Sequence, residues 1–251
     1  DFLHFQQVDQ AWQQGGLLIQ YNKIADNKWA VEKGPGYIFF LVPFELMGIP
    51  RWGNVLLALG MTIVTYILLK RLRDEKTACI GSLLMLFTPV SLIMLNRSYM
   101  DAFAANAFLV IGGGLYIYYC LERDKFRPMR GAVLLFLAFL FAAWSVVVRY
   151  SNLPIAVILA LHFVITRSRA LLRGKNTRLQ FEIPSVFLGI GLPLALLLFY
   201  NVTVFGSAFS SGYDYSSFPY KFAYQYIGAV DPTGQSIPLK IIEGNLRNVP
   251  W

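Results

Sequence analysis

The sequence predicts an all-α polytopic membrane protein, a bundle of transmembrane helices, and three observations support this fold class. Of its 251 residues, 56% are hydrophobic and only 14% are charged, against roughly 45 to 50% and about 25% in soluble domains. Six long stretches contain no Lys, Arg, Asp or Glu, and a helix needs about 20 apolar residues to cross the hydrocarbon. The charged residues collect between these stretches. Together these features exclude a disordered chain, a disulfide mini-fold and most soluble enzymes.

The predicted spans follow one another along the chain, after one shorter apolar segment. That segment, Gly36–Gly48, has about 13 residues and carries Pro43 and Glu45, which fits an interfacial or re-entrant segment better than a span. The six predicted spans are Gly53–Leu69, Thr77–Asn96, Ala102–Leu121, Gly131–Val148, Tyr150–Thr166 and Ile183–Phe205.

The net charge of +8 serves as a topology signal, because Lys and Arg collect in short cytoplasmic loops. If Gly36–Gly48 does not cross, the loops 70–76, 122–130 and 167–182 share one side and hold thirteen of the 22 basic residues and five of the 14 acidic ones. The other side then has no net charge. If the segment does cross, these loops stay together and only residues 1–35 change sides. The basic excess therefore does not call for a nucleic-acid partner.

The chain begins and ends inside polar segments, and we expect a fragment of a longer polytopic protein, truncated at both ends. We expect one transmembrane domain with three parts. These parts are a first extracytoplasmic loop with juxtamembrane helices (1–52), six transmembrane helices (53–205) and an aromatic-rich extracytoplasmic loop (206–251). Cys79 and Cys120 fall at the predicted cytoplasmic helix ends, where thiols stay reduced, so no disulfide is expected.

An amphipathic helix opens the chain. At 100° per residue, Phe5, Val8 and Trp12 share one face, and Asp1 projects onto the same stripe. A carboxylate aligned with an apolar, membrane-facing stripe is unusual. It is either a helix N-cap, where Asp is favoured, or a functional acid.

The second outer feature is Glu32-Lys33-Gly34-Pro35-Gly36, at the start of the short apolar segment. An acid and a base beside a Gly/Pro turn at the membrane surface are suited to bind a lipid phosphate, with backbone N–H groups assisting the lysine. The alternative is a solvated turn with a snorkelling lysine.

Two short outer links carry the remaining candidate charges. Arg97 and Asp101 are four residues apart and face the same way if the helix continues, either as a functional pair or as a plain salt bridge. Arg149 lies between two apolar runs with no acid nearby in the sequence. Because basic residues at bilayer depth are costly, we expect Arg149 to have a partner.

The order of these features resembles a known superfamily. An Asp opens an amphipathic loop helix, a Gly follows fifteen residues later, Glu-Lys-x-Pro precedes a short apolar helix, and Arg-x-x-x-Asp follows two spans. This order is similar to that of the GT-C glycosyltransferases, and by motif to the protein O-mannosyltransferases of glycosyltransferase family 39 and the lipid A aminoarabinose transferase. The segment Asn201–Gly206 with Ser211–Tyr213 is similar to one that is frequent in bacterial and archaeal members.

The resemblance implies an integral membrane enzyme of a prokaryotic cytoplasmic membrane, with its active site on the extracytoplasmic face. Such an enzyme transfers a hexosyl or pentosyl group from a polyprenyl-phosphate-linked sugar to a lipid, glycan or protein acceptor. Its other partners are membrane lipids and not nucleic acid. Donor sugar and acceptor are not specified by these motifs.

Functional residues carry over from the family position by position. Asp1 matches the loop carboxylate that activates the acceptor, and Asp101 matches the second acid. Lys33 matches the base that meets the lipid phosphate, and Glu32 the acid before it in the aminoarabinose transferase. Phe2 stands where the mannosyltransferases have Glu, which argues against a strict protein mannosyltransferase.

The supporting residues are less specific. We expect Arg97 and Arg149 to join Lys33 on the donor phosphate. His4 lies one turn from Asp1 and is either a metal ligand or a solvated loop residue. Family members differ in their use of a metal, so a divalent cation stays open as a cofactor. His162 lies inside a predicted span, and we expect it to be packed.

Two other classes compete with the enzyme. A transporter or flippase subunit for a lipid-linked or anionic substrate predicts ionisable groups or broken helices at mid-membrane depth. A scaffold predicts no convergence of the outer charges. The predicted spans are free of acids and bases, which favours chemistry at the membrane surface.

Overall fold

The computed structural model describes residues 21–25, 28–31, 34–88, 92, 101–173 and 178–215. The chain divides into two compact units. The first takes its described residues from Asp1–Glu32 and Ser211–Trp251, and the second from Lys33–Ser210. All the long helices belong to the second unit.

The first unit contains an antiparallel hairpin of β1 (Tyr21–Ala25) and β2 (Lys28–Val31), in which Ala25 pairs with Lys28. A short 3₁₀ turn, η3 (Gly212–Tyr215), also belongs to this unit. This hairpin was not predicted from the sequence. The available signal is the spacing, because only two polar residues separate two short runs that contain aromatic and aliphatic residues, 21–25 and 28–31.

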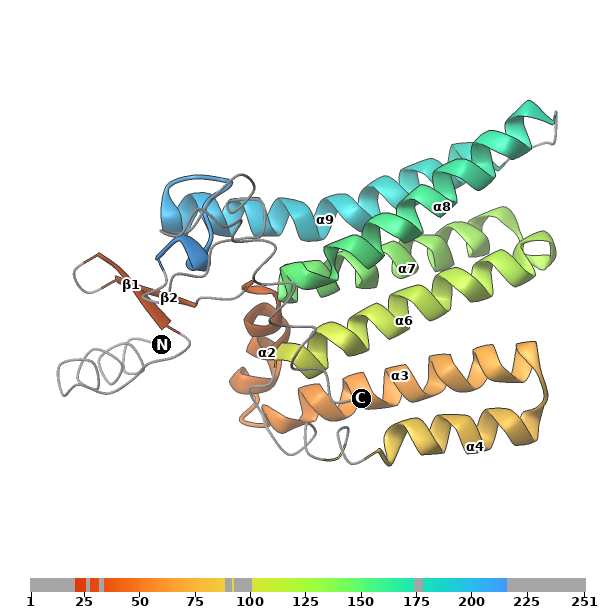
Figure 1. Cartoon of the computed structure of the whole chain (residues 1–251), viewed down its shortest axis with the longest axis horizontal. Helices are drawn as coiled ribbons and strands as arrows, with labels where there is room; N and C mark the ends of the chain where they lie inside the picture. The colour runs from red at the N-terminus through yellow and green to blue at the C-terminus, as the bar shows by residue number, and fades with distance from the viewer. Residues whose placement is uncertain are drawn as a thin grey trace, which may run out of the picture. The chain divides into compact units, whose positions relative to one another are not determined.

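The second unit is a bundle of helices that run back and forth beside one another (Figure 1). Helices α6 and α7 form an adjacent pair, α9 packs on α7, and α3 packs on both α4 and α6. Its helices are α2 (Gly36–Leu46), α3 (Arg51–Leu72), α4 (Glu75–Leu86), α6 (Asp101–Glu122), η1 (Arg123–Lys125), α7 (Pro128–Val148), η2 (Tyr150–Asn152), α8 (Leu153–Leu172) and α9 (Leu179–Phe205).

Five helical segments are long and apolar enough to cross a membrane, and this is consistent with a polytopic membrane protein. They contain five of the six predicted spans. The sixth, Thr77–Asn96, is described only in part: α4 accounts for its first half, and most of its second half lies outside the described residues. The five segments are Arg51–Leu72, Asp101–Lys125, Pro128–Val148, Tyr150–Leu172 and Leu179–Phe205.

Helix α2 is too short to cross, as its sequence predicted, with 11 residues. It runs crosswise over the ends of the longer helices (Figure 1). Gly48 allows the sharp turn into α3, because its φ of 72° lies in the left-handed region that side chains disfavour. At the far end of α3, Asp74 caps α4 by accepting a hydrogen bond from the Thr77 backbone N–H, which lowers the pKa of this carboxyl.

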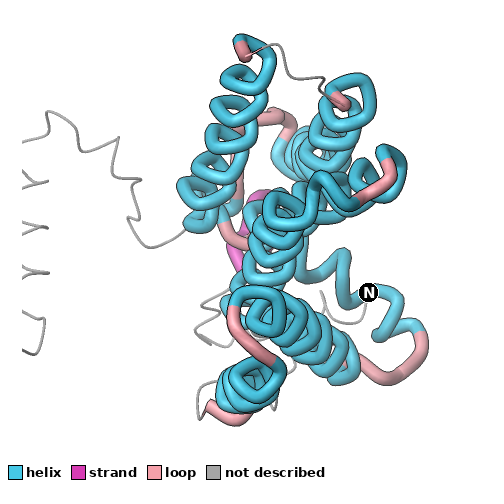
Figure 2. The backbone as a smooth tube through the Cα atoms, turned by 90° about the vertical axis from the view of Figure 1, so that its right-hand side faces the viewer, coloured by secondary structure: helices cyan, strands magenta, loops and turns pink. Residues whose placement is uncertain are grey.

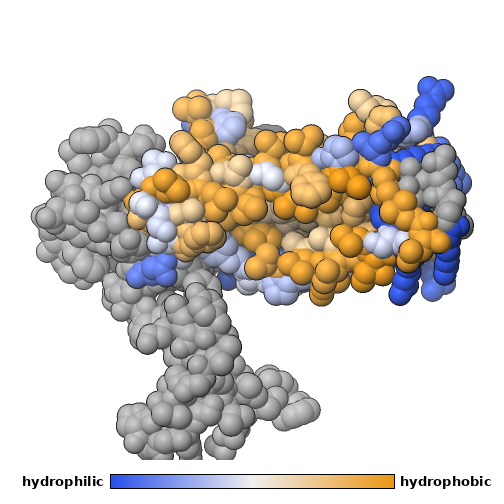
Figure 3. All heavy atoms as spheres, turned by 90° about the horizontal axis from the view of Figure 1, so that it is seen from above, coloured by the Kyte–Doolittle hydropathy of each residue, from blue (hydrophilic) through white to orange (hydrophobic). Residues whose placement is uncertain are grey.

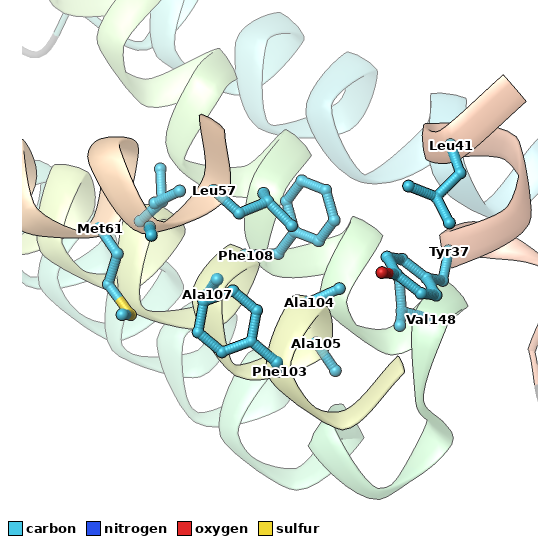
Figure 4. Packing of buried hydrophobic residues seen from close by; sticks show 12 residues of the cluster. Tyr37, Leu41, Leu57, Met61, Phe103, Ala104, Ala105, Ala107, Phe108 and Val148 are labelled. Atoms are coloured by element: carbon cyan, nitrogen blue, oxygen red, sulfur yellow. The ribbon is translucent and has the colours of Figure 1, made fainter. Parts of the chain in front are cut away.

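Helix α2 is held by a hydrophobic cluster with α3, α6 and α7 (Figure 4). The Tyr37 hydroxyl donates to Asn54 Oδ1 over 2.8 Å inside this cluster, and the Phe40 ring meets Phe108 edge-on at 5.2 Å. The cluster includes Tyr37, Leu41, Leu57, Met61, Phe103, Ala104, Ala105, Ala107, Phe108 and Val148.

Small residues allow α6 and α7 to approach closely. A Cβ atom at Gly112 would lie 2.5 Å from the Ala142 nitrogen and 2.7 Å from the Ala138 carbonyl oxygen. Helix α9 approaches α7 in the same way, since a Cβ at Gly189 would lie 2.7 Å from the Phe136 carbonyl oxygen. Between membrane helices, such contacts replace the hydrophobic driving force that water provides elsewhere. Figure 2 views these helices close to end-on.

The surface of the second unit is apolar along its flank and hydrophilic at one end (Figure 3). Ion pairs join the three basic loops at that end: Arg71 with Glu122, Arg123 with Glu182, and Arg167 with Glu182. We call it the basic end and the opposite one the outer end. The prediction that the three loops lie together is confirmed, and their cytoplasmic location stays a prediction.

Replacing Gly112 by Ala tests the close packing of α6 on α7. We expect the full-length protein in detergent to lose about 1 to 3 kcal/mol of stability, because the new methyl group meets backbone atoms that cannot move aside. Gly113→Ala is the matched control, since nothing lies within 4 Å of its Cβ position. Its unfolding midpoint should stay the same or rise. Equal midpoints for the two variants would contradict the packing.

Candidate functional site

The outer end brings together the start of α2, the start of α6 and the link from α7 through η2 into α8. Asp101 is the first residue of α6, and Arg149 lies between α7 and η2. Of the site residues predicted from the sequence, these two lie within the part of the chain that the structure describes.

Asp101 and Arg149 form an ion pair, with Arg149 Nε 3.7 Å from Asp101 Oδ2. The carboxylate side chain is 16% exposed and the guanidinium side chain 39%. The sequence predicts a partner for Arg149 without identifying it, and the structure pairs Arg149 with Asp101. A guanidinium has five N–H donors. The Arg149 guanidinium can therefore pair with Asp101 and still offer other donors to a ligand.

Hydrogen bonds on both sides hold the backbone at Arg149 in place. The Arg149 N–H donates to the Ser145 carbonyl over 2.9 Å, which continues the last turn of α7, and the Asn152 N–H donates to the Arg149 carbonyl over 3.1 Å. The buried Asn152 side chain then donates from Nδ2 to the Ala105 carbonyl over 3.2 Å. Arg149 is therefore fixed relative to the first turns of α6, where Asp101 lies.

The described part of the Glu-Lys-Gly-Pro-Gly motif packs directly against the end of α7. A Cβ at Gly34 would clash with the Val147 carbonyl oxygen, and one at Gly36 would lie 2.8 Å from the Val148 nitrogen. Trp144 Nε1 donates to the Gly36 carbonyl over 3.1 Å. Only glycine fits this close approach of two backbones. The Gly34–Gly36 turn therefore contacts the two residues of α7 that directly precede Arg149.

A wholly apolar cavity of about 190 Å³ lies between α7, α8 and α9. Val147 and Leu153 line it, and in the chain they flank Arg149 on either side. The link that carries Arg149 therefore joins two walls of the cavity. The other lining residues are Phe139, Ala142, Ala143, Val146, Ala156, Val157, Ala160, Ile190, Leu194 and Leu197.

The other predicted site residues, Asp1, His4, Glu32, Lys33 and Arg97, lie outside the described residues. Their predicted roles stay predictions. Within the described part of the chain, no group of three or more His, Cys, Asp or Glu side chains is placed to hold a metal ion.

His162 was expected to be packed, whereas it is an exposed residue of α8 whose Nδ1 lies 2.8 Å from the Tyr116 hydroxyl of α6. Two residues that the sequence analysis did not single out also belong to the outer end, Trp144 and Asn152. Asn152 precedes a helix and therefore suggests an N-cap, yet it makes no side-chain cap bond to α8 and reaches α6 instead.

Fold and site together describe a bundle of membrane-length helices that holds an Asp–Arg pair at one end, beside a glycine turn and an apolar cavity. Compared with known proteins, the chain gives no significant match to a family model, to a curated protein sequence or to a solved structure.

A double-mutant cycle of Asp101→Asn and Arg149→Gln tests the ion pair. We expect a coupling of about 1 kcal/mol between the two substitutions in the unfolding free energy, because the carboxylate is mostly shielded from solvent. The matched control is the pair Lys70–Glu75, in which the carboxylate side chain is 70% exposed. It should couple more weakly although its N–O distance is shorter. The opposite order would contradict the argument from burial.

Proposed function

We propose that this chain belongs to a membrane glycosyltransferase of the GT-C type. The enzyme transfers a sugar from a polyprenyl-phosphate carrier to an acceptor hydroxyl on the extracytoplasmic face. The observation that carries the proposal is the Asp101–Arg149 pair. Arg149 directly follows the residues that the Gly34–Gly36 turn contacts, and it belongs to the link between two helices that line an apolar cavity.

The reaction needs a carboxylate near the acceptor. The acceptor oxygen forms a bond to the anomeric carbon, the bond from that carbon to the phosphate oxygen breaks, and the acceptor proton passes to a carboxylate as polyprenyl phosphate leaves. The resemblance assigns the base to Asp1 and leaves Asp101 to orient the acceptor. The 16% exposure of Asp101 is compatible with contact to a bound hydroxyl.

The departing phosphate needs a cation that is already in place. Charge grows on this phosphate as the sugar leaves, and a pre-positioned donor lowers the barrier because it does not have to reorganise. Arg149 fits this role, since its backbone is fixed by the end of α7 and by η2 while its guanidinium stays partly exposed. Lys33 and Arg97 are assigned to the same phosphate by resemblance.

The carrier's tail needs an apolar path beside the phosphate. The cavity between α7, α8 and α9 supplies such a surface, because its lining is apolar and two of its residues, Val147 and Leu153, flank Arg149 in the chain. A phosphate on Arg149 would leave the first isoprene units at this cavity. The arrangement supports a lipid-linked donor over a water-soluble one.

The rival proposal is a transporter or flippase subunit. It predicts charged groups or an interrupted helix at mid-membrane depth. In the described part of the five long helices, Asp, Glu, Lys and Arg occur near the ends, and α9 continues from Leu179 to Phe205 across Pro193. These features favour chemistry at the outer end over passage through the bundle.

Asp101→Asn in the full-length protein should reduce sugar transfer by about 100-fold or more, because the amide cannot act as an anionic acceptor of hydrogen bonds. The measurement is mass spectrometry of lipids, glycans and proteins from a deletion strain that is complemented with the wild type or with the variant. The product is the modification that the deletion strain lacks.

Asp124→Asn is the control, because Asp124 is an exposed acid at the basic end. It should complement fully, with both variants expressed at wild-type levels. Normal product from Asp101→Asn would refute the proposal. A lost modification that contains no sugar would favour the transporter.

A further inference from the structure

The basic end holds a second polar cluster that the proposed reaction does not use. Its centre is Glu182 in the first turn of α9, which is only 2% exposed. The Tyr119 hydroxyl donates to its Oε1 over 2.5 Å, and Arg123 Nε donates to the same oxygen over 3.0 Å. Arg167 Nε lies 2.8 Å from its Oε2. One carboxylate therefore meets two guanidiniums, and the group keeps a positive charge.

Two further arginines beside this group are held by neutral partners. Arg178 Nη1 donates to the Arg123 carbonyl over 3.2 Å and also to the Phe126 carbonyl. The Arg130 guanidinium lies over the Phe126 ring, 5.7 Å from its centroid. Carbonyl groups and a ring orient a guanidinium without cancelling its charge. Both guanidiniums thus contact neutral groups of the Arg123–Phe126 turn.

Neighbouring acids do not neutralise this group. Glu122, next to Arg123 in the chain, is paired with Arg71 and Lys125. Among the described residues, no carboxylate forms an ion pair with Arg130 or Arg178. Glu182 pairs with Arg123 and Arg167, whereas Arg130 and Arg178 contact Phe126. These four arginines and Glu182 together carry a net charge of +3.

The cluster lies at the ends of helices that are long and apolar enough to cross a membrane. Arg123 directly follows α6, Arg130 lies near the start of α7, and Glu182 lies in the first turn of α9. Exposed apolar side chains, Leu121 and Met129, bracket the Arg123–Phe126 turn in the chain. A cation that stands beside lipid-facing apolar residues at a helix end reaches the headgroup phosphates.

We infer that Arg123, Arg130 and Arg178, arranged around Phe126, form a binding site for the phosphate of an anionic membrane lipid in the leaflet at the basic end. Arg123 is 21% exposed and Arg130 is exposed, so both offer donors outward. Guanidiniums suit this ligand because one guanidinium can donate two parallel hydrogen bonds to two oxygens of the same phosphate. The site lies at the opposite end from Asp101 and does not depend on the proposed reaction.

Titration of the purified full-length protein with lipid, read by native mass spectrometry, tests this site. Phosphatidylglycerol should bind more tightly than phosphatidylcholine of the same chain length, because the zwitterionic headgroup lacks a net charge. Inorganic phosphate at equal concentration should not displace it. Arg130→Gln should weaken phosphatidylglycerol binding about fivefold, and the double variant Arg130→Gln/Arg178→Gln about 25-fold. Each substitution removes one positive charge beside the lipid phosphate.

The control is the double variant Arg169→Gln/Arg173→Gln, which removes two exposed cations from the end of α8. It should keep the wild-type preference for phosphatidylglycerol. An equal loss in this control would reduce the site to an unspecific basic surface and refute the inference. So would equal affinity for the two lipids. Displacement by inorganic phosphate would identify a free-anion site instead. Arg130→Gln removes no hydrogen bond that the structure assigns, so it separates lipid binding from folding.

Discussion

The close contact between α6 and α7 determines where the functional groups of this chain lie. Lipid gives packed helices no hydrophobic advantage over separated ones, so the fit of small residues has to hold them together. Gly112 lies against the backbone of Ala138 and Ala142, and this fixes the register of the antiparallel pair. With that register, the first residue of α6 comes level with the link after α7. The Asp101–Arg149 pair and the bond from Asn152 to Ala105 are consequences of it.

Helix α7 makes the close backbone contacts that position its neighbours in the second unit. Its Ala138 and Ala142 meet α6, its Phe136 carbonyl meets Gly189 of α9, and its last turn meets the Gly34–Gly36 turn. Each contact is between backbones, so each tolerates little displacement. Helix α8 differs, because it adjoins the cavity that separates it from α7 and α9. A rigid α7 holds the ion pair, while the looser fit of α8 leaves space for an apolar chain.

The parts of this fold that were predictable are those that depend on local sequence. Uncharged length is a local property, and it located five spans and the short α2. The grouping of the basic loops followed from charge counting. Pairing between helices depends on their register, which the sequence does not reveal. Spacing along a helix related Asp101 to Arg97, whereas the structure also pairs Asp101 with Arg149, from the link between α7 and η2. Asn152 was overlooked for the same reason, because its bond to Ala105 crosses between helices.

The two ends of the bundle use their carboxylates differently, and the contrast bears on where chemistry belongs. Glu182 is enclosed by a tyrosine and two arginines from α6, η1 and α8, so its oxygens are committed to holding helices together. Asp101 meets Arg149 at 3.7 Å, and the side chain of that arginine is 39% exposed. A group that acts on a substrate must exchange its partner for the substrate during turnover. The outer pair is loose enough for that exchange, whereas Glu182 would have to leave three donors in a buried site at much higher cost.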